Sequence, residues 1–570
     1  MILDIQKVLG TLLAVVVGFW LLETLIFSWR HPKEPVYIRP RIPLLGHLTN
    51  LRNKGNPYFT EIEAKHPNLG IFALPIFFTF KIYVVANRQI YAAVQRNAKT
   101  LSFSPFSRRV TKHLCDVSDQ TARAVDLQAE DGESRSFARQ IQHVHATALS
   151  TGPSLDRLNL VTAQEMLRLV DEAVSEASKE PVRVDLVEWV SHVVTLAATE
   201  GFYGPKNPYR NPQHEKDFWT YHNKLAIFTT GLAWVLAPKA VKARDANSRR
   251  YEAYIQDGGL ETASDVIKER SNVFLRNGCP LVDAARMNTG LDLALIPNYA
   301  LTTFWAIYNV ITRPELLEAI REEVAKAVIP RDHKDDGADD LALDLSLLRT
   351  ACPLLVSTLQ ETQRLKSVHA NVRAVISDTT LTVGGEEYLL RKGNYLQLHN
   401  HVPLHNKEVW GQGADEFDPY RFIRMKKDSG DGGDGGGVVP PSQLSSLSFP
   451  VWGAAPHVCP ARYHATSGVL VLMALVALRL DVVPAADDVG EHDAARNAGG
   501  ARWKDLRDVA GVQAVYQPEG AVPVLILFFA ASIPYDYVVR CAQQALRGRA
   551  PAYSLNDFTT FPDFGELVPE

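Results

Sequence analysis

A single cysteine in a loop of small residues, followed closely by a long apolar run, constrains this chain more than any other feature. Cys459 stands in residues 449–462 (FPVWGAAPHVCPAR), and the run from Gly468 to Leu480 is almost wholly apolar. Such a run predicts a buried helix. A cysteine near the start of a helix faces the positive end of the helix dipole and free backbone N–H groups. Both lower the pKa of the thiol and favour the thiolate.

The number of nearby cysteines narrows what this thiolate could bind. No second cysteine lies near Cys459, so zinc ribbons and iron–sulfur clusters lack ligands. A lone thiolate suits a haem iron, although a lone cysteine is more often only a small buried apolar residue. The five cysteines are scattered and odd in number, which indicates a reducing compartment rather than a disulfide framework. They are Cys115, Cys279, Cys352, Cys459 and Cys541.

Two further charged segments precede the cysteine loop. Glu361 and Arg364 lie on a helical pattern, and their i, i+3 spacing places carboxylate and guanidinium on one face. Taken alone, they would be an ordinary surface ion pair worth less than about 1 kcal/mol. Residues 416–422 (EFDPYRF), which contain Arg421, follow and are expected to form a loop.

Together, in this order, the three segments resemble the signature of the cytochrome P450 superfamily. They are similar to the Glu-x-x-Arg motif of its K helix, the aromatic-Pro-x-Arg-Phe motif of its meander, and its cysteine loop. The resemblance runs from Pro40 to Leu527. The Trp452 loop, and Asn298 followed by Phe304 and Trp305, are similar to the branch of cholesterol 7α-hydroxylase and prostacyclin synthase and to fungal members of secondary metabolism. The resemblance to the superfamily implies a mainly α fold with small β-sheets and haem b as the iron cofactor.

The resemblance also implies roles for individual residues. Cys459 is implied to be the axial metal ligand of the haem. Arg373, nine residues after Arg364, matches a contact to a haem propionate, and His457 stands where the family usually carries arginine. Glu361, Arg364 and Arg421 are implied to form a buried network that holds the cysteine loop, so that their loss would abolish haem uptake.

The distal segment, residues 293–305 (LALIPNYALTTFW), departs from the family pattern of Ala-Gly-x-acid-Thr. If Ala294 aligns with the alanine, Pro297 replaces the acid and Asn298 the threonine. Pro297 removes a backbone donor and predicts a kink. Asn298 can donate and accept hydrogen bonds, so we predict that it is the catalytic residue that orients a water or a peroxide. A second alignment would use Thr302 or Thr303 instead.

The N-terminal residues predict a retained membrane anchor. Residues 8–29 are almost wholly apolar except Glu23, and about twenty residues suffice to span a bilayer. The basic residues that follow place the body of the protein in the cytosol. We therefore expect an anchor at 1–30, a stiff proline-rich hinge at 31–48 and a haem-thiolate domain at 49–530. Within that domain, residues 428–441 are glycine-rich and predicted to be a disordered insertion, and residues 531–570 form an extension of unknown role.

Two other patterns have competing interpretations. The first pattern is His399, His401 and His405. His399 and His401 would share one face of a strand, as the ligands of a metal site can, but the favoured interpretation is a strand and turn entering the meander. The apolar stretch 218–236 is either a core helix or, by family analogy, part of a substrate-access region that touches the membrane. Residues 374–400 alternate as strands do, with a turn at Gly384-Gly385.

Three functions remain open on sequence grounds. The favoured one is a monooxygenase in the endoplasmic reticulum membrane, single-pass, which takes electrons from NADPH–cytochrome P450 reductase. Its substrate would be an apolar terpenoid, steroid or alkaloid-like molecule of secondary metabolism. The second is a haem-thiolate isomerase that rearranges a peroxide substrate without a reductase. The third is a haem-binding scaffold without catalysis. The net charge of −4 gives no reason to expect nucleic acid as a partner.

Overall fold

A computed structural model describes most of the chain between residues 31 and 482. The described residues are 14, 17–18, 20–21, 24–25, 31–40, 46–54, 57–76, 80–124, 137–179, 182, 184–228, 231–330, 341–367, 370–428, 437–440, 443–445, 447–454, 457–482 and 513–515. Most of the predicted anchor, all of the extension 531–570 and residues 429–436 lie outside them. Within the described part, no helix combines the length and the apolar character that a membrane span needs.

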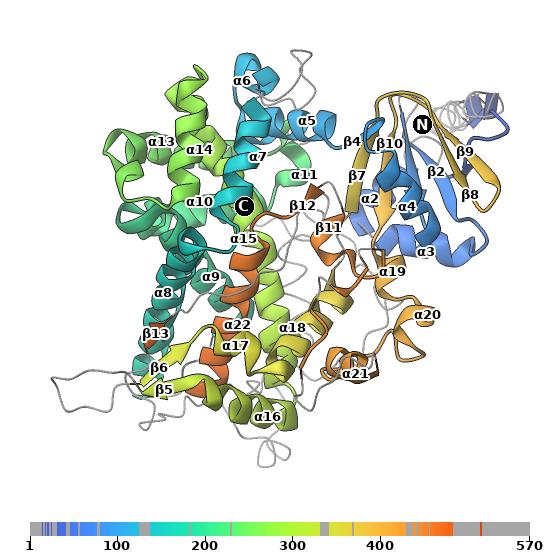
Figure 1. The fold of residues 1–570 in the computed structure, drawn as a ribbon. Helices are drawn as coiled ribbons and strands as arrows, with labels where there is room; N and C mark the ends of the chain where they lie inside the picture. Colours follow the sequence, from blue (N-terminus) through green and yellow to red (C-terminus); the bar gives the residue numbers. More distant parts are fainter. Residues whose placement is uncertain are drawn as a thin grey trace, which may run out of the picture.

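Helices make up most of the fold, as the sequence predicts. Most of them lie to one side of a six-stranded sheet, whereas the first helices of the chain, between residues 46 and 96, lie next to the sheet itself (Figure 1). The N-terminal half contains α2 (Gly46–Lys54), α3 (Pro57–Lys65), α4 (Arg88–Arg96), α5 (Ser104–Cys115), α6 (Asp119–Ala124), α7 (Phe137–Ala148), α8 (Pro153–Ala177), α9 (Leu186–Tyr203), α10 (Pro212–His222), α11 (Leu225–Phe228), α12 (Ala233–Leu236), α13 (Pro238–Gln256) and α14 (Asp265–Arg276). The C-terminal half contains α15 (Leu281–Ile311), α16 (Pro314–Val324), α17 (Leu347–Thr350), α18 (Pro353–Lys366), α19 (His401–Leu404), α20 (Lys407–Trp410), α21 (Arg421–Asp428) and α22 (Arg462–Arg479).

The six-stranded sheet has the order β1-β2-β3-β10-β7-β4. Its strands are β1 (Val36–Tyr37), β2 (Ile71–Ile76), β3 (Phe80–Val85), β10 (Tyr395–His399), β7 (Ala370–Val375) and β4 (Leu101–Ser102). Strand β2 is apolar on both faces because alternate side chains enter two different clusters: Ile71 and Ala73 pack on one side, Phe72 and Leu74 on the other. The sheet thus joins the first hundred residues to the segment just before the meander.

Three small sheets complete the fold. They pair β5 (Val328–Pro330), β6 (Leu341–Asp344) and β13 (Gln513–Val515); β8 (Thr379–Val383) with β9 (Glu386–Leu390); and β11 (Gly453–Ala454) with β12 (His457–Val458). The predicted turn between β8 and β9 is confirmed. Gly384 and Gly385 both have positive φ, 60° and 87°, which a two-residue hairpin turn requires and which glycine adopts without strain.

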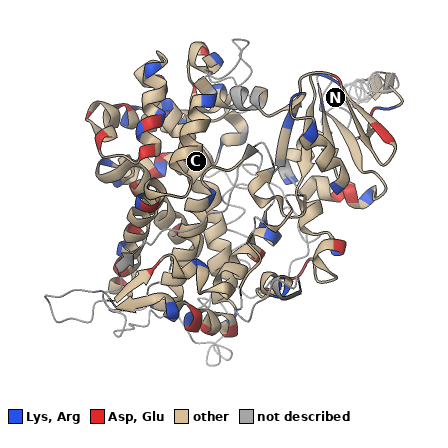
Figure 2. Ribbon diagram, in the orientation of Figure 1, with Lys and Arg blue, Asp and Glu red and all other residues tan. Residues whose placement is uncertain are grey.

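Two apolar helices form the centre of the helical part. Helix α15 is 31 residues long and contacts α9, α13, α18 and α22. Its C-terminal stretch, residues 293–311, carries no charged residue, and neither do residues 464–478 of α22. Figure 2 shows charged positions mostly on the outer helices, whereas α15 and α22 are largely tan. Helices that are apolar around most of their circumference are buried, which confirms the prediction for the run after Cys459.

The structure differs from the sequence predictions at three boundaries. The predicted hinge is partly built into the sheet, because Val36–Tyr37 pairs with β2 and the buried Glu34 accepts a hydrogen bond from Tyr83 at 2.7 Å. The EFDPYRF segment is not wholly a loop, because α21 begins at Arg421. Val439, inside the predicted disordered insertion, is buried, and its carbonyl accepts from Gln360 Nε2 at 3.0 Å.

Candidate functional site

A short hairpin presents Cys459 at the head of α22. The 3₁₀ turn Pro450–Trp452 leads into β11, β11 pairs antiparallel with β12, and Cys459 follows directly. Gly453 has a φ of 84°, a conformation that side chains with a Cβ avoid, and this lets the chain reverse there. The Cys459 N–H donates to the carbonyl of Trp452 at 3.3 Å. The hairpin therefore fixes where the sulfur lies.

The Cys459 thiol is buried, and burial governs its acidity. Burial raises the pKa of the thiol well above its ordinary value, while the N–H groups of Ala461 and Arg462 and the Arg462 charge act in the opposite direction. The sequence argument predicted a lowered pKa because it weighed only the helix terminus. The donors are present, but desolvation of the thiolate outweighs them. A thiolate here needs a cation in direct contact, as an iron ion would provide.

Glu361, Arg364 and Arg421 form one buried network, and the structure brings these three predicted residues together. Arg364 Nε and Nη2 donate to the two Glu361 oxygens at 2.8 Å each, and Arg421 Nε is 3.1 Å from both. The Asp418 N–H adds a fourth donor group to Glu361 at 3.1 Å. The carboxylate is thus surrounded by donors, which offsets the cost of burying its charge.

The two arginines of this network also hold the chain that leads to the cysteine loop. Arg364 Nη1 donates to the carbonyls of Leu404 and Ala414 at 2.6 Å each. Arg421 donates to the carbonyls of Trp410 at 2.7 Å and Gly413 at 2.8 Å. Four carbonyls, at the ends of α19 and α20 and in the turn after α20, therefore depend on two side chains. This explains why both residues must be arginine, with its several donors in fixed directions.

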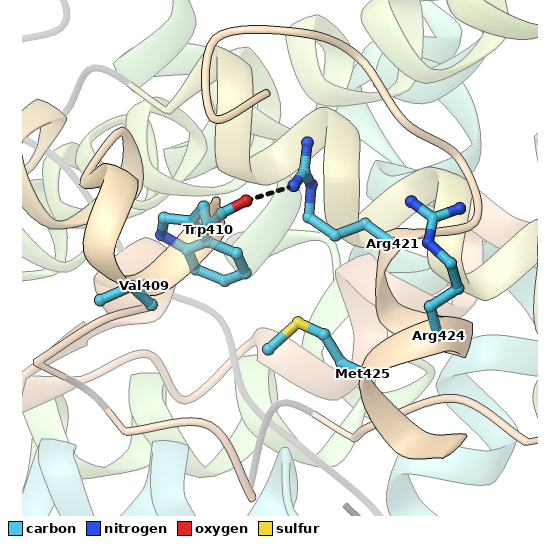
Figure 3. Close-up of a pocket in the computed structure, with 5 residues that line it drawn as sticks. All are labelled: Val409, Trp410, Arg421, Arg424 and Met425. Carbon is cyan, nitrogen blue, oxygen red and sulfur yellow. Dashed lines mark hydrogen bonds between the residues drawn. The ribbon is translucent and has the colours of Figure 1, made fainter. Parts of the chain in front are cut away.

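A cavity of about 240 Å³ lies beside this network (Figure 3). It is lined by Val409, Trp410, Arg421, Arg424 and Met425, and the dashed line in Figure 3 marks the bond from Arg421 to the Trp410 carbonyl. None of these lining residues belongs to the cysteine loop or to α15. The cavity is a feature of the meander packing and not of the cysteine loop.

Arg373 is a buried cation on β7, where it pairs with Leu396 of β10. Its side chain donates to Asn371 Oδ1 at 2.9 Å and to the Val372 carbonyl at 2.8 Å. Burial lowers the pKa of Arg373 to about 10. No carboxylate lies within 4 Å of it in the described part of the chain. A buried cation with only neutral acceptors fits the binding of an anionic group.

Helix α15 presents one partly accessible stripe between its buried faces. Leu291, Ala294, Asn298, Thr302 and Trp305 recur every three or four residues and are half-buried, while most of their neighbours on the helix are fully buried. The helix is continuous through Pro297, so the predicted kink is not a break in the helix. Proline does, however, leave the carbonyl of the preceding turn without its usual N–H donor.

The candidate polar residues of the distal segment, Asn298, Thr302 and Thr303, differ in the hydrogen bonds that their side chains form. Asn298 Nδ2 is buried and has no hydrogen-bond partner among the described residues. The Thr303 hydroxyl donates to the Tyr299 carbonyl at 2.8 Å and is buried, so it is already occupied. Thr302 lies on the same stripe as Asn298, one turn later. Of the two threonines in the second alignment, only Thr302 remains a candidate. Asn298 is the candidate whose side-chain donor is shown to be unused among the described residues.

The three histidines lie where the strand-and-turn interpretation puts them. His399 ends β10 and His401 begins α19, and the rings of His401 and His405 are 4.0 Å apart. His399 contacts Thr60 Oγ1 at 2.9 Å, and His405 contacts Asp415 at 2.8 Å. In the described part of the chain, no three His, Cys, Asp or Glu side chains are grouped to hold a metal ion.

Some expected contacts lie beyond what the structure describes, and two residues were missed. His457 is placed in β12 by its backbone, and its side chain lies outside the described part. No hydrogen bond or ion pair of the described residues joins Arg373 or Asn298 to Cys459. Sequence reasoning missed the unsatisfied side-chain atoms of Trp452 and Arg462, whose Nε1 and Nε are buried without a hydrogen-bond partner among the described residues. The signal for Arg462 was its position three residues after Cys459, at the start of an apolar helix.

Comparison with known proteins places this geometry in a family. Residues 297–494 match the family model described as Cytochrome P450. Cytochrome P450 monooxygenase nodJ of Hypoxylon pulicicidum is 29% identical over 461 residues, 80% of this chain and 85% of that protein. Cytochrome P450 7B1 of Mus musculus is 23% identical, covering 83% and 89%. The 7-alpha-hydroxycholest-4-en-3-one 12-alpha-hydroxylase of Homo sapiens is 22% identical, covering 83% and 91%.

Together with the helical fold and the buried cysteine loop, these matches identify an oxidoreductase of the haem-iron class. The chain belongs to the cytochrome P450 superfamily, and its relatives from Hypoxylon pulicicidum and Gibberella zeae are named as cytochrome P450 monooxygenases. The residues present fit a haem. Cys459 offers one buried sulfur, Arg373 a buried cation without a carboxylate partner in the described part, and Trp452 and Asn298 unused donors.

Proposed function

We propose that this chain is a haem-thiolate monooxygenase that inserts one oxygen atom into an apolar small molecule. The observation that carries the proposal is the pairing of a buried, hairpin-held Cys459 with a half-buried stripe on α15 that bears one unused amide donor. When bound, haem b supplies dioxygen activation. Cys459 would bind its iron, and Arg373 and His457 would supply donors to its propionates. Glu361, Arg364 and Arg421 hold the loop that carries the cysteine.

The distal chemistry of this chain rests on Asn298. Its amide would hold a proton-bearing water, a role for which the superfamily usually carries an acid and an alcohol. Leu291 and Ala294 on the same stripe offer only apolar surface, which favours a substrate without charges. This agrees with a terpenoid, steroid or alkaloid-like substrate of secondary metabolism. One relative is named as a 5-beta-cholestane-3-alpha,7-alpha-diol 12-alpha-hydroxylase.

We further propose that the protein is anchored in the endoplasmic reticulum membrane by residues 1–30, with its body in the cytosol. There NADPH–cytochrome P450 reductase delivers electrons. The apolar stretch 218–236 supports a second membrane contact, because it divides into two parts. Phe218, Leu225 and Phe228 are buried, whereas Leu232, Trp234, Val235 and Leu236 are exposed, Trp234 to 71%. Contiguous exposed apolar side chains favour an apolar surface as partner.

The experiment is turnover in microsomes, with and without the reductase, against a panel of apolar metabolites. We expect NADPH-dependent formation of products heavier by one oxygen atom. Products that appear only with the reductase support the monooxygenase. Absence of NADPH-dependent product from every substrate of the panel, in protein with full haem content, counts against it.

A second function is favoured by one specific observation. Pro297 and Asn298 stand where the superfamily usually carries an acid and an alcohol, so the usual pair for proton delivery is missing. A haem-thiolate isomerase that rearranges a peroxide substrate needs neither reductase nor external protons. Conversion of a lipid-like peroxide to an isomer of equal mass, without NADPH, would identify this activity.

A further inference from the structure

Asp116 is the only non-glycine residue with positive φ in the described part of the chain, at 60°. It directly follows α5 and donates its N–H to the Lys112 carbonyl at 3.1 Å, so it caps that helix. Glycine is the usual residue at such a cap, because a Cβ makes the left-handed conformation costly. An aspartate in this conformation therefore raises the question of what its side chain does.

The Asp116 carboxylate contacts arginines from two other helices. Its Oδ2 lies 3.3 Å from Arg244 Nη2 of α13 and 3.4 Å from Arg286 Nη2 of α15. Arg286 Nη1 also donates to the Asp116 carbonyl at 2.6 Å. A single exposed ion pair contributes little to stability, but a network of several charges can contribute more. Asp116 therefore joins the end of α5 to two helices at once.

The two arginines have few other carboxylates to pair with. The Arg244 side chain is only 7% exposed, and its other carboxylate partner is Asp245 at 2.7 Å. Arg286 lies 3.8 Å from Asp283, close to the outer limit of an ion pair. Loss of the Asp116 carboxylate would therefore leave each arginine with one carboxylate, and for the buried Arg244 this loss is the more costly.

Helix α5 packs against the two elements that carry the predicted distal and propionate residues. It contacts α15, which carries Asn298, and β7, which carries Arg373. Figure 1 shows α5 between the helical part and the sheet. The last residue of α5, Cys115, lies against bare backbone of α15, because a Cβ at Gly290 would overlap its sulfur. The position of α5 thus determines how closely the two elements are bridged.

We propose that Asp116, with Arg244 and Arg286, forms a latch that holds α5 over the space between α15 and β7. This proposal rests on the proposed function, because it takes that space to be where the haem and the apolar substrate bind. Asp116 is a positioning residue that sets access to the space. The other printed anchor at this end of α5 is neutral: the Tyr221 hydroxyl of α10 donates to the Leu114 carbonyl at 2.8 Å. Salt should therefore weaken the latch more than this anchor.

The test measures access to the haem in the full-length, haem-loaded protein. The probe is phenylimidazole, which shifts the Soret band when it binds the iron, and its association rate is measured by stopped flow. Asp116→Asn removes the charge but keeps the size of the side chain and its tolerance of positive φ. We expect association to become about two- to fivefold faster, the effect of losing partly exposed charge pairs. Added salt should speed association in the wild type more than in Asp116→Asn. An association rate equal to that of the wild type would overturn the proposal.

Asp116→Gly separates the latch from simple capping of α5. Glycine suits the positive φ and keeps the cap, but it has no carboxylate. If Asp116 only caps the helix, this variant should leave hydrogen exchange of the α5 amides, residues 104–115, unchanged, and that result would overturn the proposal. The latch predicts faster exchange of these amides in Asp116→Gly and in Asp116→Asn.

Matched variants identify the contact and the reason for a failure. Arg286→Gln should speed association too, and the double variant with Asp116→Asn should be no faster than Asp116→Asn alone; additive effects would overturn the shared contact. Asp378→Asn is the control, because its pair with Arg391 is elsewhere and its carboxylate is 47% exposed, against 52% for Asp116. If the carbon monoxide complex lacks the thiolate band, the proposed function fails, and hydrogen exchange of α5 still decides the latch.

Discussion

Arg364 and Glu361 form a bidentate ion pair one turn apart on α18, with both side chains fully buried and both N–O distances 2.8 Å. This arrangement differs from an exposed i, i+3 pair in what its loss leaves behind. An exposed pair is replaced by water, whereas here an unpaired carboxylate would remain inside the protein. Arg364 also donates to backbone carbonyls of the meander. Loss of the pair would therefore also disturb the chain that leads to the cysteine loop.

Arg364→Ala should therefore abolish haem uptake. Removing one partner of a buried ion pair costs about 3–5 kcal/mol of stability, and two backbone carbonyls lose their donor as well. The measurements are the haem-to-protein ratio and urea unfolding. Arg391→Ala is the matched control, because its pair with Asp378 is exposed, and it should leave haem content unchanged. Wild-type haem content in Arg364→Ala would contradict the role of the network.

Cys459→Ala should eliminate the red-shifted Soret band that thiolate ligation gives to the reduced, carbon monoxide-bound protein. The reason is that Cys459 is the single sulfur presented at the head of α22. Cys352→Ala is the control, because Cys352 is an equally buried cysteine elsewhere in the core. A spectrum typical of imidazole ligation in the intact protein would show that another residue binds the iron.

The helical fold, the ion-pair helix and the apolar helix after Cys459 could be predicted because each depends on local pattern or on a motif with fixed spacing. The acidity of Cys459 could not, since burial depends on which helices cover the loop, and that is a property of the whole fold. The same holds for Arg373, whose lack of a carboxylate partner among the described residues appears only when β7 is placed between β4 and β10. The contact between His464 and Asn159 joins residues 305 positions apart, and no sequence spacing predicts it.

Deletion of residues 1–30 should leave part of the protein bound to membranes, because Leu232, Trp234, Val235 and Leu236 remain exposed. Adding Trp234→Asp and Leu236→Asp to the deletion should release it into the soluble fraction after carbonate extraction. Val161→Asp with Val184→Asp is the matched control, since both valines are exposed apolar residues elsewhere on the surface. Complete solubility after the deletion alone would argue against a second contact.

Asp292→Asn should lose less stability than the wild type does as the pH rises. Asp292 is buried on α15 and accepts from Tyr203 at 2.8 Å, Tyr209 at 3.0 Å and Tyr251 at 2.5 Å. Burial raises the pKa of this carboxyl from 3.8 to about 7, against the effect of the three phenols. Between these values the folded state binds more protons than the unfolded state, so the stability contribution is lost as pH rises.

The measurement is Tm from about pH 5 to about pH 8. The wild type should lose more stability across this window than Asp292→Asn does. Asp257→Asn, an exposed position at the end of α13, is the control and should follow the wild type. Identical slopes in Asp292→Asn and wild type would show that the carboxyl is already ionised in the folded protein at the lower pH.

Asn298→Ala should lower product formation while leaving the haem spectrum and substrate binding nearly unchanged. Asn298 lies on the half-buried stripe of α15, and its Nδ2 has no partner among the described residues, so removing this donor breaks no hydrogen bond of Nδ2 there. The loss of a positioned proton-transfer group reduces the rate by about 10²-fold, and a group acting through a water less, on the order of 10-fold. In a monooxygenase the electrons would then appear as hydrogen peroxide. In an isomerase the same variant would lose activity on a peroxide substrate without any reductase.

Thr302→Ala tests the alignment, and Thr303→Ala controls for a hydroxyl already bonded to the helix backbone. Full activity in Asn298→Ala together with a large loss in Thr302→Ala would move the distal role one turn along α15.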